Sequence, residues 1–294
     1  MAIFTGSAVA LVTPFKDGKV DYPAMEQMIE EQIAQGTDAL AVCGTTGEAP
    51  TLKDEEQIQI VRFAVMQTAG RIPVIAGAGS NDTDHAVYMS CALKDVGADA
   101  LLLVTPYYNK CSQDGLVSHY ITIANAAELP CILYSVPGRT GVNITPYAVS
   151  RLCDHPYIAA IKEASGNISQ VAEIAQYISD DFDLYSGNDD MVVPIMSLGG
   201  KGVISTAANV VPKDMHQMTE RFFKGDIQGA AELQLSMKPL MDALFCEVNP
   251  IPVKAALHML GKIQAEYRLP LCAPSPQSLE RIRNELTRYG LLPL

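Results

Sequence analysis

A lysine at the end of an apolar run is the residue whose position suggests chemistry most directly. Lys162 closes the run 158–161 (IAAI), which is typical of a buried strand, and Glu163 follows it. Burial disfavours the ammonium and lowers the pKa of a lysine, and the neutral amine is the nucleophile that forms a Schiff base with a ketone. Taken alone, the position favours a lysine that reaches the surface or pairs with Glu163. Other segments must decide between these interpretations.

Polar residues follow a second apolar run in the order Gly44-Thr45-Thr46-Gly47-Glu48. Glycines allow backbone N–H groups to approach a small anion, and the two threonine hydroxyls add hydrogen-bond donors. This combination suits a carboxylate, although the same residues could form a plain turn.

A tyrosine and an arginine belong to a third such segment. Tyr134 lies in the run 131–135, and Arg139 lies in the turn Pro137-Gly138-Arg139-Thr140-Gly141. Arg139 could grip a substrate carboxylate with its planar fork or lie exposed at the surface. Tyr134 could move protons or be a core aromatic residue with a satisfied hydroxyl.

No metal site is expected. Asp189 and Asp190 are adjacent acids without a matching cluster of histidines or carboxylates, so a solvated helix start is the favoured interpretation. The five histidines lack the spacing of metal ligands.

Alternating elements must position these residues. Short apolar runs alternate with amphipathic segments eight times, and most runs are continuously apolar, as in strands that are covered on both faces. Strands are expected at residues 8–13, 39–43, 74–77, 100–104, 131–135, 158–162, 183–186 and 202–205, and helices at 22–35, 53–68, 83–96, 113–127, 145–153, 168–178, 191–198 and 211–223.

Eight strand–helix units predict a (β/α)8 TIM barrel, with an open doubly wound sheet as the alternative. The catalytic barrel is expected at residues 1–225. A C-terminal helical region, 226–294, carries a three-helix appendage at 226–248, 252–262 and 275–289. In such barrels the active site lies at the C-terminal ends of the strands, where Lys162 and the other polar residues are expected.

Composition limits the partners. The 294 residues carry a net charge of -12, which argues against nucleic acid and an anionic membrane surface. The seven cysteines are scattered and never form a C-x-x-C pair, which favours a reducing compartment. No leader or membrane span is apparent, so a soluble cytoplasmic protein is expected. No nucleotide fingerprint or phosphate cup suggests a cofactor.

The converging lysine, tyrosine, threonines and arginine suit Schiff-base chemistry on a small 2-oxo acid. Over almost its whole length the chain resembles the dihydrodipicolinate synthase (4-hydroxy-tetrahydrodipicolinate synthase) family. The motifs that carry the resemblance are the Gly44-Thr45-Thr46-Gly47-Glu48 turn, the 134–141 segment and Ile161-Lys162-Glu163-Ala164-Ser165-Gly166.

The resemblance implies a lyase that condenses pyruvate with L-aspartate 4-semialdehyde in the biosynthesis of lysine and diaminopimelate, with no cofactor beyond the covalent imine. It implies that Lys162 forms the imine and that Tyr134, Thr45 and Tyr108 form a proton relay, with Tyr108 coming from a second subunit across a tight dimer. Thr46 would bind the pyruvate carboxylate together with Thr45, and Arg139 the semialdehyde carboxylate. Gly187 and Ile204 would line the site.

The resemblance also implies a homotetramer, a dimer of tight dimers, with a lysine-binding regulatory site at the tight interface. Its positions here would be Ala49, Asp54, Gln57, Asn81, His85 and Tyr107. Since His85 stands where lysine-inhibited members have a glutamate, the partner of the ligand's ammonium is lost. We therefore predict weak or absent inhibition by lysine.

Two other functions remain open at this point. The superfamily includes N-acetylneuraminate lyase and 2-keto-3-deoxy sugar acid aldolases, which share the lysine and the tyrosine; the segment around Arg139 favours the synthase. The other alternative is a non-catalytic barrel that retains the pocket.

Overall fold

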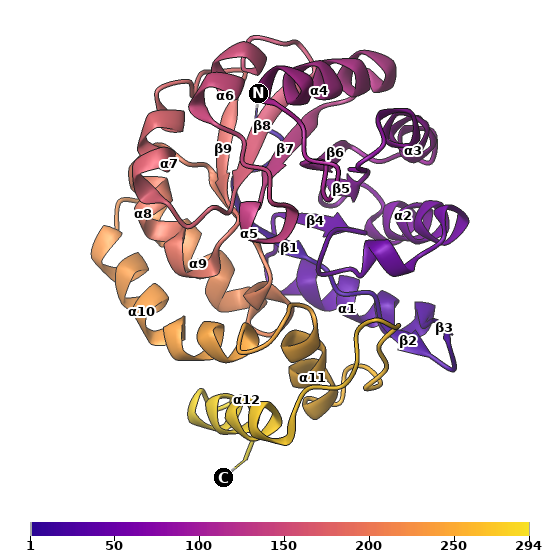
Figure 1. Cartoon of the computed structure of the whole chain (residues 1–294). Helices are drawn as coiled ribbons and strands as arrows, with labels where there is room; N and C mark the ends of the chain where they lie inside the picture. Colours follow the sequence, from indigo (N-terminus) through magenta and orange to yellow (C-terminus); the bar gives the residue numbers. More distant parts are fainter. Residues whose placement is uncertain (1, 294) are drawn as a thin grey trace.

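The computed structural model describes residues 2–293 and contains a closed barrel of parallel strands with helices around it (Figure 1). The strands follow one another around the barrel in chain order, and β1 closes it by pairing with both β4 and β10. They are β1 Gly6–Ala10, β4 Ala39–Val42, β5 Val74–Gly77, β6 Ala100–Val104, β7 Cys131–Ser135, β8 Ile158–Glu163, β9 Asp183–Ser186 and β10 Gly202–Ser205. The predicted (β/α)8 barrel is confirmed, and the open sheet is excluded.

The barrel helices occupy the predicted segments, with ends that shift by a few residues. They are α1 Tyr22–Ala34, α2 Asp54–Thr68, α3 Thr83–Asp95, α4 Gln113–Ala127, α6 Pro146–Leu152, α7 Ile168–Ala175, α8 Val192–Ser197 and α9 Pro212–Phe223. The Asp21 carboxylate caps α1 by accepting from the Ala24 N–H, and Thr145 caps α6. Each side chain satisfies a backbone donor that the first helical turn leaves free.

The first strand differs from its prediction. Hydrophobicity extends through residues 8–13, but β1 covers Gly6–Ala10. Beyond it, the Val12 N–H donates to the Asn209 side chain at 3.1 Å rather than to a neighbouring strand. A small antiparallel hairpin, β2 Phe15–Lys16 and β3 Lys19–Val20, follows and was not predicted. The residues between β1 and the hairpin stay buried although they lie outside the sheet. The apolar run is therefore longer than the strand.

Short helical turns lie at the ends of several strands and were not predicted. They are η1 Ala49–Thr51, α5 Pro137–Thr140, η2 Asp189–Met191 and η3 Ala207–Asn209. All follow the C-terminal ends of strands, so they shape the end of the barrel where an active site is expected. At the opposite end the Phe4 ring stacks on Tyr185, with ring centroids 4.3 Å apart, and the Tyr185 hydroxyl donates to the Phe4 carbonyl. This contact fills the N-terminal end of the barrel.

The predicted C-terminal helices are present as α10 Ile227–Leu244, α11 Ile251–Met259 and α12 Pro276–Arg288. Figure 1 shows them together on one side of the barrel, with α10 beside α8 and α9. α12 packs on both α10 and α11. The boundary at residue 225 between barrel and appendage remains a prediction.

Candidate active site

Lys162 lies near the C-terminal end of β8, with its side chain directed into the barrel mouth. The residue is only 5% exposed, and its Nζ lies 4.3 Å from the centre of the Tyr134 ring. Burial lowers the pKa of Lys162 to about 8; the Asp189 carboxylate opposes this shift and the Arg139 guanidinium adds to it. Near neutral pH a usable fraction of the amine is therefore unprotonated, as a nucleophile requires.

Tyr134 lies beside Lys162 because their strands are in register, Tyr134 opposite Lys162 on β7 and β8. The ring is buried, which raises the pKa of the phenol; the Arg139 charge and a hydrogen bond with Thr45 act in the opposite direction. Tyr134 is thus protonated at neutral pH and can donate a proton to an oxygen held near Lys162. Tyr134 also lines the cavity, so its ring is not enclosed by the core on every side.

The Gly44–Glu48 turn leaves the end of β4 and forms another wall. Two backbone hydrogen bonds of 3.1 Å stabilise the turn. The Gly47 N–H donates to the Gly44 carbonyl, and the Glu48 N–H donates to the Thr45 carbonyl. The Thr46 side chain is buried and Thr45 is half-buried, and both line the cavity. The turn therefore presents hydroxyl groups at the place where a small anion would lie beside Lys162.

Arg139 lies in α5 at the rim of the same cavity. Its side chain is exposed, and Nη2 donates to the Asn249 carbonyl at 3.1 Å. The guanidinium is at the surface and also lines the cavity, so its exposure does not prevent contact with a bound molecule. An exposed cation at a cavity mouth suits the capture of an anionic substrate.

Gly187, at the end of β9, leaves room for the Lys162 side chain. A Cβ on Gly187 would lie 2.6 Å from the Ala164 Cβ and 3.1 Å from the Lys162 Cε. The cavity has a volume of about 70 Å³ and is enclosed mainly by the residues above. Ile204, predicted to line the site, is buried in the apolar cluster that contains Tyr134 and is not on the cavity wall.

Comparison with known proteins identifies the family of this chain. The model of the dihydrodipicolinate synthetase family matches residues 3–288. A 4-hydroxy-tetrahydrodipicolinate synthase from a Thermoanaerobacter species is 51% identical over 293 residues, which covers 99% of both chains. The chain belongs to the dihydrodipicolinate synthetase family.

Solved structures of dihydrodipicolinate synthases agree closely. The enzyme from Thermotoga maritima has a TM-score of 0.97 and 42% identity, and the match covers 99% of this chain and 100% of that one. The Acinetobacter baumannii enzyme, solved in complex with pyruvate, has a TM-score of 0.96 and 45% identity and covers 98% of this chain and 99% of that one. The predicted family, fold, synthase activity and lyase class are confirmed.

Tyr108, the remaining predicted member of the proton relay, does not line the cavity beside Lys162. Its side chain is 93% exposed, and its backbone has a φ of 70°, in the left-handed region. Tyr107 beside it is 38% exposed. A large aromatic side chain that is exposed to this extent is available to contact another molecule.

The predicted regulatory positions of the family surround a neighbouring cavity of about 440 Å³ that also reaches Thr45 and Tyr134. Ala49, Asp54, Gln57, His85 and Tyr107 line it. Asn81 is not on its wall; the Asn81 carbonyl accepts a hydrogen bond from Asn109.

Inside this second cavity, His85 contacts a carboxylate. Its Nε2 lies 3.1 Å from the Asp54 Oδ1, and its Nδ1 lies 3.2 Å from the Ser80 hydroxyl. His85 is therefore already bonded to two polar groups of this cavity.

The environment of Asp189 differs from the one predicted. A solvated helix start was expected, but Asp189 is 3% exposed, and its Oδ2 accepts from the Thr206 and Ala207 N–H groups at 3.2 and 2.8 Å. The donors compensate for burial, although burial still raises the pKa of the carboxyl. Asp190 is exposed, as expected, and lies 3.8 Å from the Lys238 ammonium.

Sequence reasoning missed two polar residues of the site in this family member, Thr206 and Asn249. Asn249 donates to the Thr46 hydroxyl at 2.9 Å, and the Thr206 hydroxyl lies 3.3 Å from the same oxygen. Asn249 lies in the short segment between the helices predicted at 226–248 and 252–262, where no site residue was expected. Thr206 directly follows β10, so the rule that located Lys162 would have found it.

Among residues 2–293, no cluster of three potential metal ligands is present. Within the same part of the chain, no helix is both long and apolar enough to cross a membrane.

Proposed function

We propose that this chain condenses pyruvate with L-aspartate 4-semialdehyde through an imine on Lys162, in the route to diaminopimelate and lysine. The observation that carries the proposal is the buried Lys162 amine beside the Tyr134 phenol, at a cavity lined by threonine hydroxyls. A relative in complex with pyruvate adds support.

The proposed reaction begins with attack of the neutral Lys162 amine on the C2 carbonyl of pyruvate. A carbinolamine forms, its oxygen leaves as water after protonation, and a protonated imine remains. Loss of a C3 proton converts this imine into an enamine. The enamine C3 then attacks the aldehyde carbon of the second substrate, and the aldehyde oxygen gains a proton to become a hydroxyl. The amino group of the second substrate displaces Lys162 from the imine carbon and closes the ring.

Tyr134 is the proposed proton carrier for these steps. Burial raises its pKa, so it acts as a proton donor that regains its proton through Thr45 rather than as a standing phenolate. Tyr108 of a second copy is the proposed link between this relay and solvent, since its exposed side chain does not line its own cavity. This role requires at least the tight dimer; the homotetramer predicted above contains two such dimers.

Two separate groups bind the proposed carboxylates. Thr45 and Thr46 take the carboxylate of pyruvate, close to Lys162, and Arg139 takes that of the semialdehyde at the cavity mouth. Gly187 and Ile204 contribute space and apolar backing. The imine itself accepts the electron pair, so the proposed reaction needs no further cofactor. A biosynthetic step of this kind fits the predicted cytoplasmic location.

The activity test is a condensation assay with pyruvate and the semialdehyde, run in parallel with pyruvate and a sugar-derived aldehyde. We expect turnover with the semialdehyde only. Borohydride reduction in the presence of pyruvate, followed by peptide mass spectrometry, should place the adduct on Lys162. An adduct on another lysine would overturn the mechanism, faster turnover of the sugar substrate would favour a sugar acid aldolase, and no adduct at all would favour a non-catalytic barrel.

Weak or absent inhibition by lysine belongs to the same proposal. His85 supplies no negative charge for the ligand's ammonium, and the nearby Asp54 carboxylate contacts His85 Nε2. Binding of lysine would have to break this contact and leave a charge poorly paired in a partly enclosed cavity.

A further inference from the structure

Contacts from far along the chain hold the Gly44–Glu48 turn. The Asn249 Nδ2 donates to the Thr46 hydroxyl across 203 positions of sequence, and both side chains are buried on the cavity wall. Asn249 also accepts from Arg139 through its carbonyl. The segment after α10 therefore contacts both groups to which the proposed function assigns substrate carboxylates.

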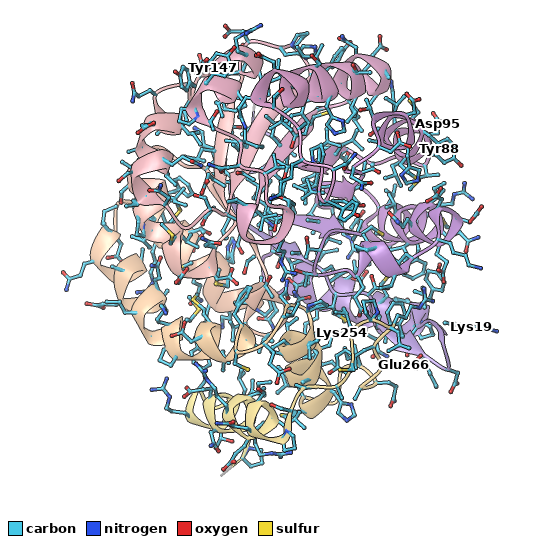
Figure 2. The ribbon with its side chains drawn as sticks, in the orientation of Figure 1. Lys19, Tyr88, Asp95, Tyr147, Lys254 and Glu266 are labelled. Carbon is cyan, nitrogen blue, oxygen red and sulfur yellow. The ribbon has the colours of Figure 1, made fainter. Side chains whose placement is uncertain are left out.

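Glu48, the last residue of this turn, is buried in an ion pair with α11. Lys254 Nζ lies 2.5 Å from the Glu48 Oε1, and both side chains are 0% exposed. The Glu48 Oε2 accepts from the Arg268 backbone N–H at 3.3 Å. Lys254 Nζ also lies 4.3 Å from the Phe15 ring centre. Figure 2 labels Lys254 on α11. A charge pair that is fully removed from water holds its two partners in one geometry, since either charge alone is costly there.

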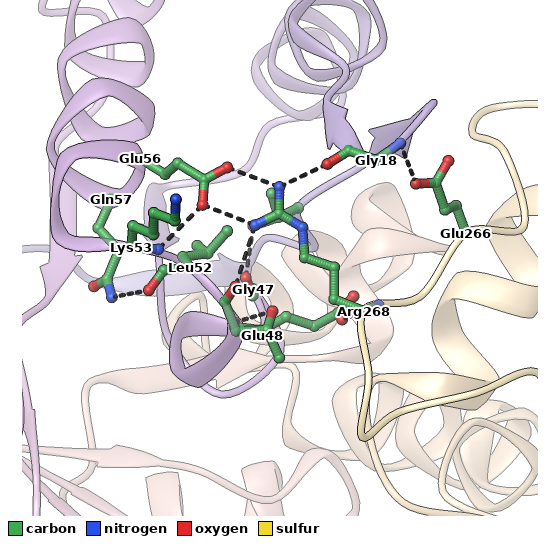
Figure 3. Close-up of polar contacts among 11 residues, drawn as sticks. Gly18, Gly47, Glu48, Leu52, Lys53, Glu56, Gln57, Glu266 and Arg268 are labelled. Atoms are coloured by element: carbon green, nitrogen blue, oxygen red, sulfur yellow. Dashed lines mark hydrogen bonds and ion pairs between the residues drawn. The ribbon is translucent and has the colours of Figure 1, made fainter.

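A second ion pair fastens the segment that carries Arg268, independently of Lys254. The Arg268 guanidinium binds the Glu56 carboxylate through two hydrogen bonds of 2.8 and 2.7 Å and donates to the Gly18 carbonyl (Figure 3). Glu266 accepts from the Gly18 N–H at 2.6 Å. Loss of the Lys254 ammonium would therefore leave this segment attached and affect mainly Glu48.

Movement of Glu48 reaches the threonines directly. Its N–H donates to the Thr45 carbonyl, and its backbone has a φ of 56°, which an L-residue adopts only where surrounding contacts hold it. Glu48 and Lys254 do not line the cavity. Any effect of this pair on substrate binding must therefore pass through the turn.

We propose that Lys254 and Glu48 are positioning residues that hold Thr45 and Thr46 in the geometry that binds the pyruvate carboxylate. This inference rests on the proposed function, which assigns that carboxylate to the two threonines. The ion pair fixes the end of the turn, and Asn249 fixes the Thr46 hydroxyl within it. The C-terminal region thus completes the substrate site rather than merely covering the barrel.

The test compares Lys254→Met, the double variant Glu48→Leu/Lys254→Met and the control Lys262→Met. Lys262 lies in the same C-terminal region and pairs with Glu31 on α1 at 2.6 Å, and neither residue belongs to the turn or lines the cavity. For each protein, the KM for pyruvate, kcat, thermal unfolding and the pyruvate concentration that half-saturates the borohydride-trapped adduct are measured.

We expect the KM for pyruvate and the half-saturating concentration to rise about tenfold in both Lys254 variants, with kcat changed less, because small misplacements of binding groups carry large penalties. The double variant should regain thermal stability and keep the raised KM, which separates positioning from folding. Lys262→Met should keep the wild-type KM. Wild-type pyruvate binding in the double variant overturns the proposal, even if Lys254→Met fails to fold.

The two proposals fail in different ways. A wild-type adduct without condensation would overturn the proposed condensation but leave the positioning test intact through the adduct measurement. No pyruvate adduct in the wild type would overturn both.

Discussion

Lys162 and Lys254 are both buried lysines, but their surroundings give them different chemistry. Lys254 contacts the Glu48 carboxylate directly, whereas no carboxylate within residues 2–293 forms an ion pair with Lys162. Burial lowers the pKa of both amines; the hydrogen-bonded Glu48 opposes the shift at Lys254, and Asp189, which forms no ion pair with Lys162, opposes it there. A bonded carboxylate favours the charged form of the amine and holds it in one position. An amine without such a partner gives up its proton more readily and can act as a nucleophile.

Burial alone therefore does not identify a catalytic lysine; the contacts of Nζ do. Aromatic rings lie 4.3 Å from both ammonium groups, Tyr134 at Lys162 and Phe15 at Lys254, so this contact does not separate them either. The carboxylate is the difference, and the following changes test it.

The largest effect is expected for Lys162→Met. Activity should fall by roughly 10⁴-fold or more, as for removal of other covalent nucleophiles. Stability at pH 7 should rise by about 1–3 kcal/mol, because a lysine with a pKa near 8 in the fold bears a cost while it is charged. That gain should vanish as the pH rises through about 10, where the unfolded lysine is also neutral. Turnover assays and urea unfolding measure both. Substantial residual activity would remove the distinction between the two lysines.

Tyr134→Phe keeps the ring beside Lys162 and removes only the hydroxyl. We expect kcat to fall by roughly 10²–10³-fold, within the range of general acid–base catalysis. The pyruvate adduct should still form, but more slowly, which single-turnover trapping would measure. An unchanged kcat would assign Tyr134 to packing alone.

Lys254→Met should lower mainly the stability of the protein, whereas Lys162→Met should lower mainly its activity. It leaves the Glu48 carboxylate buried without its partner, which costs about 3–5 kcal/mol in comparable pairs. Replacement of both residues by Leu and Met should recover most of this loss in urea unfolding. If the single and double variants are equally stable, the pair does not depend on charge compensation.

The pH dependence of kcat/KM for pyruvate should report Lys162. Below its pKa of about 8 the neutral amine decreases about tenfold per pH unit, so the rate constant should rise with pH and level off near that value. Lys254→Arg, which keeps the positive charge, should leave the position of this rise unchanged. A profile that is flat from pH 6 to pH 9 would contradict the lowered pKa.

The smallest effect concerns the second cavity, where His85 and Asp54 are in contact. Lysine at about 1 mM should change activity by less than twofold, because the Asp54 carboxylate that could receive its ammonium is already bonded to His85. His85→Glu provides the matched variant and should increase sensitivity. Half-inhibition of the wild type below that concentration would sink the prediction.

Lys162, Tyr134 and the threonine turn could be located from the sequence. Polar residues at strand ends meet at one end of the barrel, and this rule needs only local patterns. The burial of Asp189 could not be predicted in this way. It depends on N–H donors 17 and 18 residues later, which no local pattern contains. The Glu48–Lys254 pair spans 206 positions, so neither residue stands out from its own neighbours. A local sequence pattern does not show which distant residues compensate a buried charge.

The distance between Glu48 and Lys254 along the chain also orders events during synthesis. The ribosome adds about 5–20 residues per second, so roughly 10–40 s separate the appearance of Glu48 from that of its partner, 206 positions later. During that interval the nascent chain carries the threonine turn with its terminal carboxylate still in water. A fragment that ends soon after β10 contains Lys162, Tyr134 and every strand of the barrel. It nevertheless lacks Asn249 and Lys254, and with them the contacts that finish the substrate site.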